Sequence, residues 1–148
     1  MIAALTVSPV RQHVGLYFPT DPDHSLNNVG VADFLRDVLR HLRGKVIVVW
    51  DRGSNHKGEP IRALLRRFPR LSIEWLPAYA PELNPVELVW AYLKYGRMAN
   101  FVPTGLRHLE DEVVDHLINT RIEPSLLRSL WDGSELPFPT RLSKPEPQ

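Results

Sequence analysis

The apolar residues near the N-terminus of this 148-residue chain fall into two short runs separated by turn-forming residues. Residues 2–8 (IAALTVS) and 13–18 (HVGLYF) are rich in Val, Leu and aromatic side chains, as strands usually are. The segment 9–12 between them predicts a turn, and 19–28 predicts a loop. The pattern therefore predicts a hairpin at the start of the chain.

The next two apolar patterns differ in period. Apolar residues recur at helical spacing over 31–42, which predicts a helix with Asn27 or Asn28 as its cap and an end at Gly44. Residues 46–50 (VIVVW) are instead continuously apolar and mostly β-branched. Such a run is typical of a central strand buried on both faces.

The remaining signals alternate between helix and strand. They predict a helix at 60–68, a strand at 71–76, helices from residue 85 and over 104–117, and a short helix near 126–131. This order predicts an α/β fold with a mixed sheet flanked by helices. We expect one domain over 1–120, followed by 121–148 with the short helix and a proline-rich, disordered tail from residue 137.

Composition excludes several kinds of protein. The chain has no cysteine, so disulfides and thiolate metal sites are ruled out, and its six histidines form no zinc motif. No apolar run is long enough to span a bilayer, and we expect a cytoplasmic protein without membrane contact. The net charge of +1 makes no case for nucleic acid by itself.

Two carboxylates stand where active sites form in α/β proteins. Asp51 ends the buried run 46–50, and sites in open sheets gather at the carboxyl ends of strands. Glu87 lies at the start of a predicted helix, on the border of its apolar stripe. Taken alone, each has a simpler interpretation: Asp51 as a loop residue, and Glu87 as part of a capping box with Asn84.

Other polar residues surround these two along the chain. His56, in the loop after Asp51, is either an orienting group or a surface histidine, and Asn84 is either a site residue or only a helix cap. Several basic residues could follow a DNA backbone or simply be solvated: Arg62, Arg66, Arg67, Arg70, Lys94 and Arg97.

The pattern of residues 46–94 as a whole favours the functional interpretation of these residues over the simpler one. A buried strand ends in Asp51, His56 follows in a loop, and LPAYAPELNPVE (76–87) precedes a W-x-x-L-K helix. This combination resembles the catalytic core of bacterial insertion-sequence transposases related to the mariner superfamily. The hairpin and the first helix also resemble the family, so the likeness runs to about Pro103.

The resemblance implies a ribonuclease H-like fold and a triad of carboxylates that binds two divalent metals, Mg²⁺ or Mn²⁺. The substrates it implies are DNA, at the transposon ends and at the target. Residue matching makes Asp51 the second carboxylate and Glu87 the third, both catalytic and both metal ligands, with His56 and Asn84 in supporting roles. Hard cations of this kind prefer oxygen ligands.

The sequence departs from the family at the first carboxylate, which belongs on a strand preceding 2–8. Asp21 and Asp23, in a later loop, are poor substitutes. We therefore expect the C-terminal part of a transposase catalytic domain, missing the first strand and inactive alone, with the N-terminal transposase part or a second copy as partner. Two alternatives stay open: a non-catalytic regulator of a full-length transposase, and another ribonuclease H-like nuclease.

Overall fold

The computed structural model describes residues 1–20 and 26–139. The loop with Asp21 and Asp23 and most of the predicted tail lie outside these residues. The strands are β1 (Ala4–Ser8), β2 (His13–Tyr17), β3 (Val46–Trp50) and β4 (Leu71–Trp75). The helices are α1 (Asn28–His41), α2 (Glu59–Arg67), α3 (Pro85–Ala91), α4 (Leu106–Arg121) and α5 (Pro124–Asp132), with short 3-10 turns η1 (Ser54–His56) and η2 (Pro81–Leu83). The α/β prediction and the order of its elements are confirmed.

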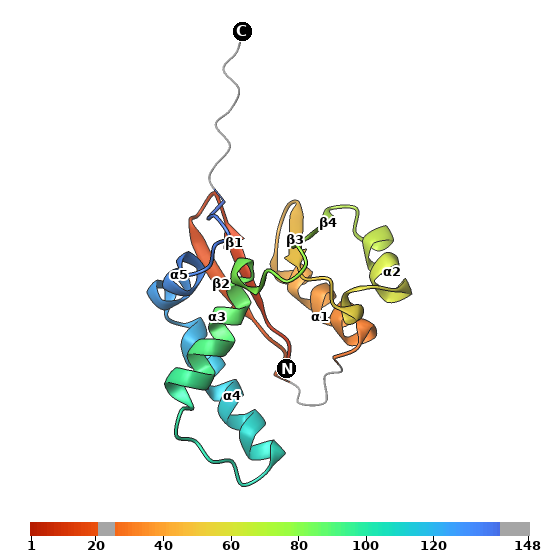
Figure 1. The fold of residues 1–148 in the computed structure, drawn as a ribbon. Coiled ribbons are helices and arrows are strands. Elements are labelled where there is room, and N and C mark those ends of the chain that lie inside the picture. The colour runs from red at the N-terminus through yellow and green to blue at the C-terminus, as the bar shows by residue number, and fades with distance from the viewer. Residues whose placement is uncertain (21–25, 140–148) are drawn as a thin grey trace.

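One half of the molecule, which combines segments from both ends of the chain, is built on the predicted hairpin. Strands β1 and β2 pair antiparallel, and the buried side chains of Val14 and Leu16 point to the same face of β2. That face packs against α4 and α5, with α3 against β1 (Figure 1). The buried residues form what we call the hairpin cluster: Val14, Leu16, Phe18, Val89, Leu93, Leu117, Leu127 and Trp131.

The other half of the molecule contains β3, β4, α1 and α2. The two strands pair in parallel, and α2 connects them as a crossover helix. Asn27 caps α1, since its side chain accepts hydrogen bonds from the backbone N–H groups of Val29 and Gly30, both at 3.0 Å. The buried residues form what we call the α1 cluster: Val31, Ala32, Leu35, Leu39, Trp50, Ile61, Leu64 and Leu71.

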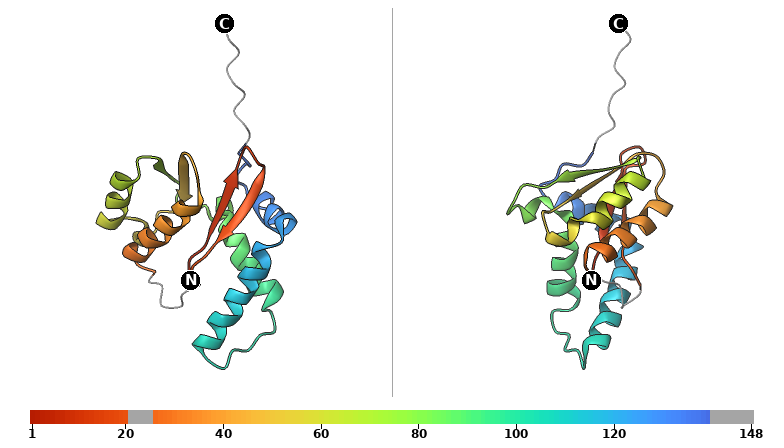
Figure 2. Two further views of the ribbon diagram at one scale, coloured as in Figure 1. Left: turned by 180° about the vertical axis from the view of Figure 1, so that it is seen from behind. Right: turned by 90° about the vertical axis from the view of Figure 1, so that its right-hand side faces the viewer.

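The strands form two separate sheets. Within the described part of the chain, β1 pairs with β2 and β3 with β4, so β1 and β3 each keep one unpaired edge. Both views from front and back place β1 and β3 as neighbours between the two halves (Figures 1 and 2). The combination of antiparallel and parallel pairs with flanking helices is consistent with the expected ribonuclease H-like fold.

Strand β3 is less buried than its sequence predicts. Val46 and Val48 pack on the α1 cluster, but Ile47 is 64% exposed and Val49 is 42% exposed. Continuous apolar character predicts burial on both faces, and here only one face is covered. The uncovered face is one that an additional element could cover.

Helix α3 continues without a break into a π-helix, η3 (Tyr92–Arg97). The sequence predicts a single helix here, because helical spacing does not separate the two forms. The next helix, α4, has Gly105 as its N-cap, and the backbone N–H of Thr104 donates to His108 Nδ1 at 3.2 Å. Among the described residues, no helix is both long enough and apolar enough to cross a bilayer.

Candidate active site

Asp51 lies directly after β3, at the carboxyl end of the parallel pair. Its side chain is 57% exposed, and Oδ1 accepts a hydrogen bond from the backbone N–H of Gly53 at 2.8 Å. His56 Nδ1 lies 2.9 Å from the same oxygen and 3.1 Å from the backbone oxygen of Asp51. These contacts fix the direction of the carboxylate while leaving much of it accessible to solvent.

His56 is itself held in place by packing. Its ring stacks on the buried Trp50 with a centroid distance of 4.4 Å and an angle of 2° between the planes. Only 16% of the His56 side chain is exposed. The predicted supporting role of His56 is therefore compatible with its position, since it joins the α1 cluster to the carboxylate.

Glu87 and Asn84 lie at the start of α3. Asn84 is the N-cap, because its side chain accepts from the backbone N–H of Val86 at 3.3 Å. The N–H of Glu87 donates to the backbone oxygen of Asn84 at 3.0 Å, and the Glu87 side chain is exposed. The cap leaves Asn84 half-buried at the mouth of the site, which accounts for its position without a chemical role.

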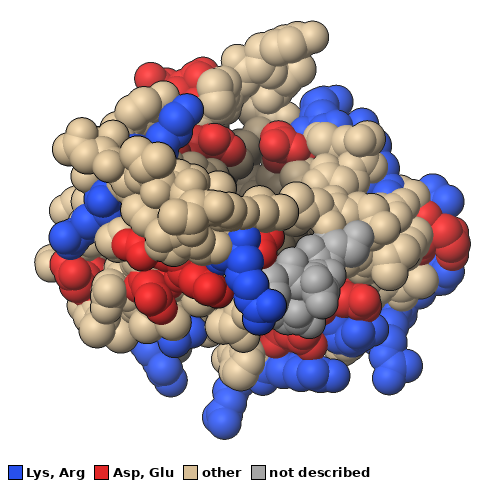
Figure 3. Space-filling view, turned by 90° about the horizontal axis from the view of Figure 1, so that it is seen from below, with Lys and Arg blue, Asp and Glu red and all other residues tan. Residues whose placement is uncertain are grey.

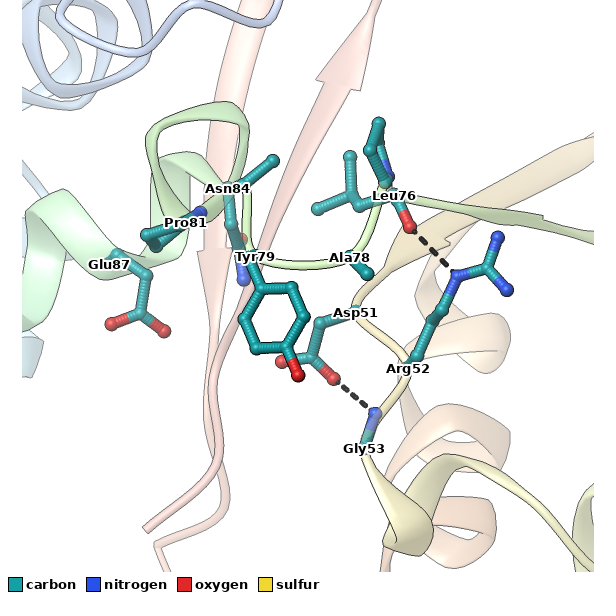
Figure 4. Close-up of a pocket in the computed structure, with 11 residues that line it drawn as sticks. Asp51, Arg52, Gly53, Leu76, Ala78, Tyr79, Pro81, Asn84 and Glu87 are labelled. Atoms are coloured by element: carbon teal, nitrogen blue, oxygen red, sulfur yellow. Dashed lines mark hydrogen bonds between the residues drawn. The ribbon is translucent and has the colours of Figure 1, made fainter.

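A pocket of about 450 Å³ brings the two carboxylates together. In Figure 4 the Asp51 carboxylate points toward the side of the pocket on which Glu87 lies. The lining residues come from the end of β3, the loop after β4 and the start of α3: Asp51, Arg52, Gly53, Leu76, Pro77, Ala78, Tyr79, Ala80, Pro81, Asn84 and Glu87. Three of the four predicted site residues thus meet in one pocket, and His56 bonds to one of them.

The two carboxylates are anchored in different hydrophobic clusters. Asp51 follows Trp50, which belongs to the α1 cluster, whereas Glu87 lies on the helix that contributes Val89 to the hairpin cluster. The loop 76–84 connects them. The buried Leu76 fastens its start, because the N–H of this residue donates to the backbone oxygen of Trp50 at 2.9 Å.

The donor chemistry of the pocket fits a hard divalent cation. Carboxylate oxygens are the preferred ligands of Mg²⁺, and one or two carboxylates with substrate phosphate and water often suffice for it. Within residues 1–20 and 26–139, however, no three side chains of His, Cys, Asp or Glu gather into a metal-binding group. In the described part of the chain, Asp51 and Glu87 thus bring two carboxylates to the pocket, one fewer than such a group needs.

The basic residues of α2 are engaged with a neighbouring acid. Arg62 Nε lies 3.0 Å from a Glu59 carboxylate oxygen, and Arg66 forms a second ion pair with the same carboxylate. The hydrogen bond from Arg66, followed by that from Arg62, lowers the pKa of Glu59 below its ordinary value of 4.5. Arg67 instead lies over the ring of Phe68.

The other basic residues lie elsewhere. Lys94 and Arg97 are on η3, where Arg97 Nε donates to the hydroxyl of Tyr92 at 2.7 Å and Lys94 lies over Tyr95. Arg70 donates to the backbone oxygens of Gly44 at 2.9 Å and Leu39 at 2.5 Å, so it ties the end of α1 to β4. Seen from below, Lys and Arg alternate with Asp and Glu over the surface, and acidic side chains flank a hollow (Figure 3).

Of the residues that line the pocket, only Asp51, Asn84 and Glu87 were predicted as site residues, and Arg52 and Tyr79 are among the others. Arg52 lies at the rim, with its Nε donating to the backbone oxygen of Leu76 at 3.4 Å. Tyr79 is fully exposed and has a positive φ of 59°. The sequence signal for Tyr79 was its place in the motif LPAYAPELNPVE that carries the family resemblance, and a backbone angle cannot be obtained from such a motif.

Comparison with known proteins gives one match. A family model described as DDE superfamily endonuclease matches residues 6–104, which include Asp51, Glu87 and every residue that lines the pocket. No curated protein and no solved structure shows significant similarity to the chain.

Proposed function

Because the chain belongs to the DDE superfamily endonucleases, we propose that it forms part of the active site of a DNA transposase that cleaves and transfers DNA strands. Domains of this kind act on DNA and generally use divalent metal ions. The observation that carries the proposal is the meeting of Asp51 and Glu87 in one pocket, from elements far apart in the sequence.

Asp51 and Glu87 are the residues that would hold Mg²⁺ or Mn²⁺. When bound, such ions stabilise the attacking and leaving oxygens of an in-line displacement at phosphorus. The chain's own contribution is to position the ligands. The Gly53 N–H and the His56 ring orient Asp51, and the cap by Asn84 fixes the helix start that carries Glu87.

A third carboxylate is the next part of this proposal, and the unpaired edges of β1 and β3 are where a strand carrying it would fit. The edge of β3 that faces away from β4 supports this placement, because an added strand would pair with its backbone N–H and C=O groups. The N-terminal part of a transposase or a second copy of the domain would supply the strand. Its carboxyl end would lie near Asp51 if it ran parallel to β3.

Metal binding tests the two assigned ligands directly. Addition of Mn²⁺ should broaden the amide NMR signals of residues around the pocket, such as Gly53 and Tyr79, before signals elsewhere. Asp51→Asn and Glu87→Gln should each weaken this effect. Asp132→Asn is the matched control, since Asp132 is a half-exposed carboxylate paired with Arg128 on α5. Broadening that is unchanged in both pocket variants would contradict the assignment.

Cleavage tests the complete proposal. The chain alone should not transfer strands, and the chain mixed with the N-terminal transposase part should cleave transposon-end DNA in Mg²⁺. Efficient Mg²⁺-dependent cleavage by the chain alone would show that Asp51 and Glu87 need no third carboxylate.

A second candidate function is regulation without catalysis. The observation in its favour is that the described residues contain only two of the three carboxylates in one group. In that case the chain would occupy a transposase assembly and lower its activity. Addition of the chain to an active transposase should then reduce transposition, and an unchanged rate would exclude this role.

A further inference from the structure

Tyr79 is exposed to an unusual degree for an aromatic side chain. Its relative exposure is 102%, whereas aromatic residues normally contribute large buried areas to folding. A ring in this position gives the folded chain almost no burial energy. The ring is therefore open to a contact with another molecule.

The backbone at Tyr79 is also held in a conformation that its side chain disfavours. A φ of 59° lies in the left-handed region, where residues with a bulky side chain are outliers and glycine is the usual choice. Gln12 shares this feature, but it lies in the hairpin turn between β1 and β2. Strain of this kind persists where the surrounding structure imposes it, often at ligand sites.

The segments on both sides of Tyr79 impose this conformation. Before it, Leu76 is buried and bonded to β3, and Pro77 restricts the chain. After it, η2 begins at Pro81, and the N–H of Glu135 donates to the backbone oxygen of Glu82 at 2.9 Å. The loop 76–84 is thus held in place at both ends, and the ring of Tyr79 projects from its middle.

The Tyr79 ring lies at the same pocket as the two candidate metal ligands. Tyr79 comes from the loop after β4, whereas Asp51 follows β3 and Glu87 lies on α3 (Figure 4). Arg52 is on the same rim, with an exposed side chain. An exposed aromatic face at a pocket that takes DNA suits a nucleobase.

We infer that Tyr79 is a positioning residue that stacks on an unpaired nucleobase of the DNA flanking the reacting phosphate. This rests on the proposed function, because it takes DNA as the substrate of the pocket. Aromatic stacking of this kind tolerates any base, since every base has a π-face. The inference therefore predicts a contribution to DNA affinity that does not depend on sequence.

The test uses the whole chain and a short DNA duplex with a single-stranded overhang that contains a fluorescent adenine analogue. Anisotropy gives the affinity, and emission of the analogue reports stacking. Tyr79→Phe should behave as the wild type in both. Tyr79→Leu and Tyr79→Gly should bind about tenfold more weakly and lose the emission change. Tyr95→Leu is the matched control, because Tyr95 is 72% exposed but does not line the pocket.

The outcomes separate this inference from the proposed function. If the wild type does not bind the DNA, the proposed function itself fails. If the wild type binds and Tyr79→Leu binds equally well with the same emission change, the stacking role is wrong and the proposed function stands. If Tyr79→Leu instead changes only self-association in sedimentation, the ring contacts protein, which also overturns the inference. Tyr79→Gly, which suits the positive φ, guards against a loss caused by misfolding.

Discussion

The site depends on two hydrophobic clusters, and this predicts that they can be loosened separately. Leu117 is fully buried in the hairpin cluster. Leu117→Ala should destabilise that cluster by about 2–5 kcal/mol, from lost burial and the cavity left behind. This is a large share of the roughly 5–15 kcal/mol that stabilises a typical domain. The extensive contacts between elements run within each half, so the α1 cluster should be affected much less.

Native-state amide hydrogen exchange measures this prediction segment by segment. In Leu117→Ala, exchange in β2, α4 and α5 should accelerate by roughly one to four orders of magnitude, since each 1.4 kcal/mol is a factor of ten. Exchange in α1 and β3 should stay near the wild type. The reciprocal variant Leu39→Ala, in the α1 cluster at 3% exposure, should give the opposite pattern.

A functional consequence follows for the proposed metal site. Leu117→Ala should weaken Mn²⁺ binding although neither carboxylate is altered, because α3 carries Glu87 and belongs to the loosened half. The halves do touch, for example where the rings of Tyr17 and His41 lie 5.9 Å apart. Equal acceleration of exchange in both halves would refute the reasoning and show one cooperative unit.

Three further predictions concern single residues. Arg70→Met should lower the free energy of unfolding by about 1–3 kcal/mol in urea denaturation, because two backbone oxygens lose their charged donor, and no loss would contradict its structural role. The lowered pKa of Glu59 means that its pairing stabilises the fold above pH 4.5 and is lost as pH falls through the lowered value. Glu59→Gln should therefore reduce Tm at neutral pH but not in acid. A difference in Tm between variant and wild type that stays the same at all pH values would contradict this. Gly58→Ala should lower Tm, since φ is 104° and the new Cβ would lie 2.7 Å from Asn28 Nδ2, whereas an unchanged Tm would show that the loop adapts.

Local signals in the sequence predicted much of the fold. The caps at Asn27 and Asn84 are confirmed. They could be predicted because a side-chain oxygen just before a helix accepts hydrogen bonds from the backbone N–H groups of its first turn. The apolar stripe of α1 predicted its buried face for the same reason. Asp51 and Glu87 were assigned to one site by the family resemblance over 46–94 together with their places at a strand end and a helix start, and both line the pocket.

Long-range features were not accessible in the same way. The exposure of Ile47 depends on which elements lie beside β3, and the composition of a strand carries no information about its neighbours. Arg70 connects α1 to β4 by hydrogen bonds to backbone oxygens that come within bonding distance only when the chain has folded. From sequence, the same arginine is indistinguishable from one that binds DNA.

The open edge of β3 also bears on how the chain behaves at high concentration. VIVVW combines β-branched residues with no charge and no proline, which is the composition of segments that assemble into intermolecular sheets. Lys45 and Asp51 flank it on either side, as charged residues do where they limit aggregation. We therefore expect Asp51 to limit aggregation in addition to its proposed metal-binding role. Asp51→Asn should lower the solubility of the chain, so aggregation must be measured before any loss of activity is ascribed to the metal site.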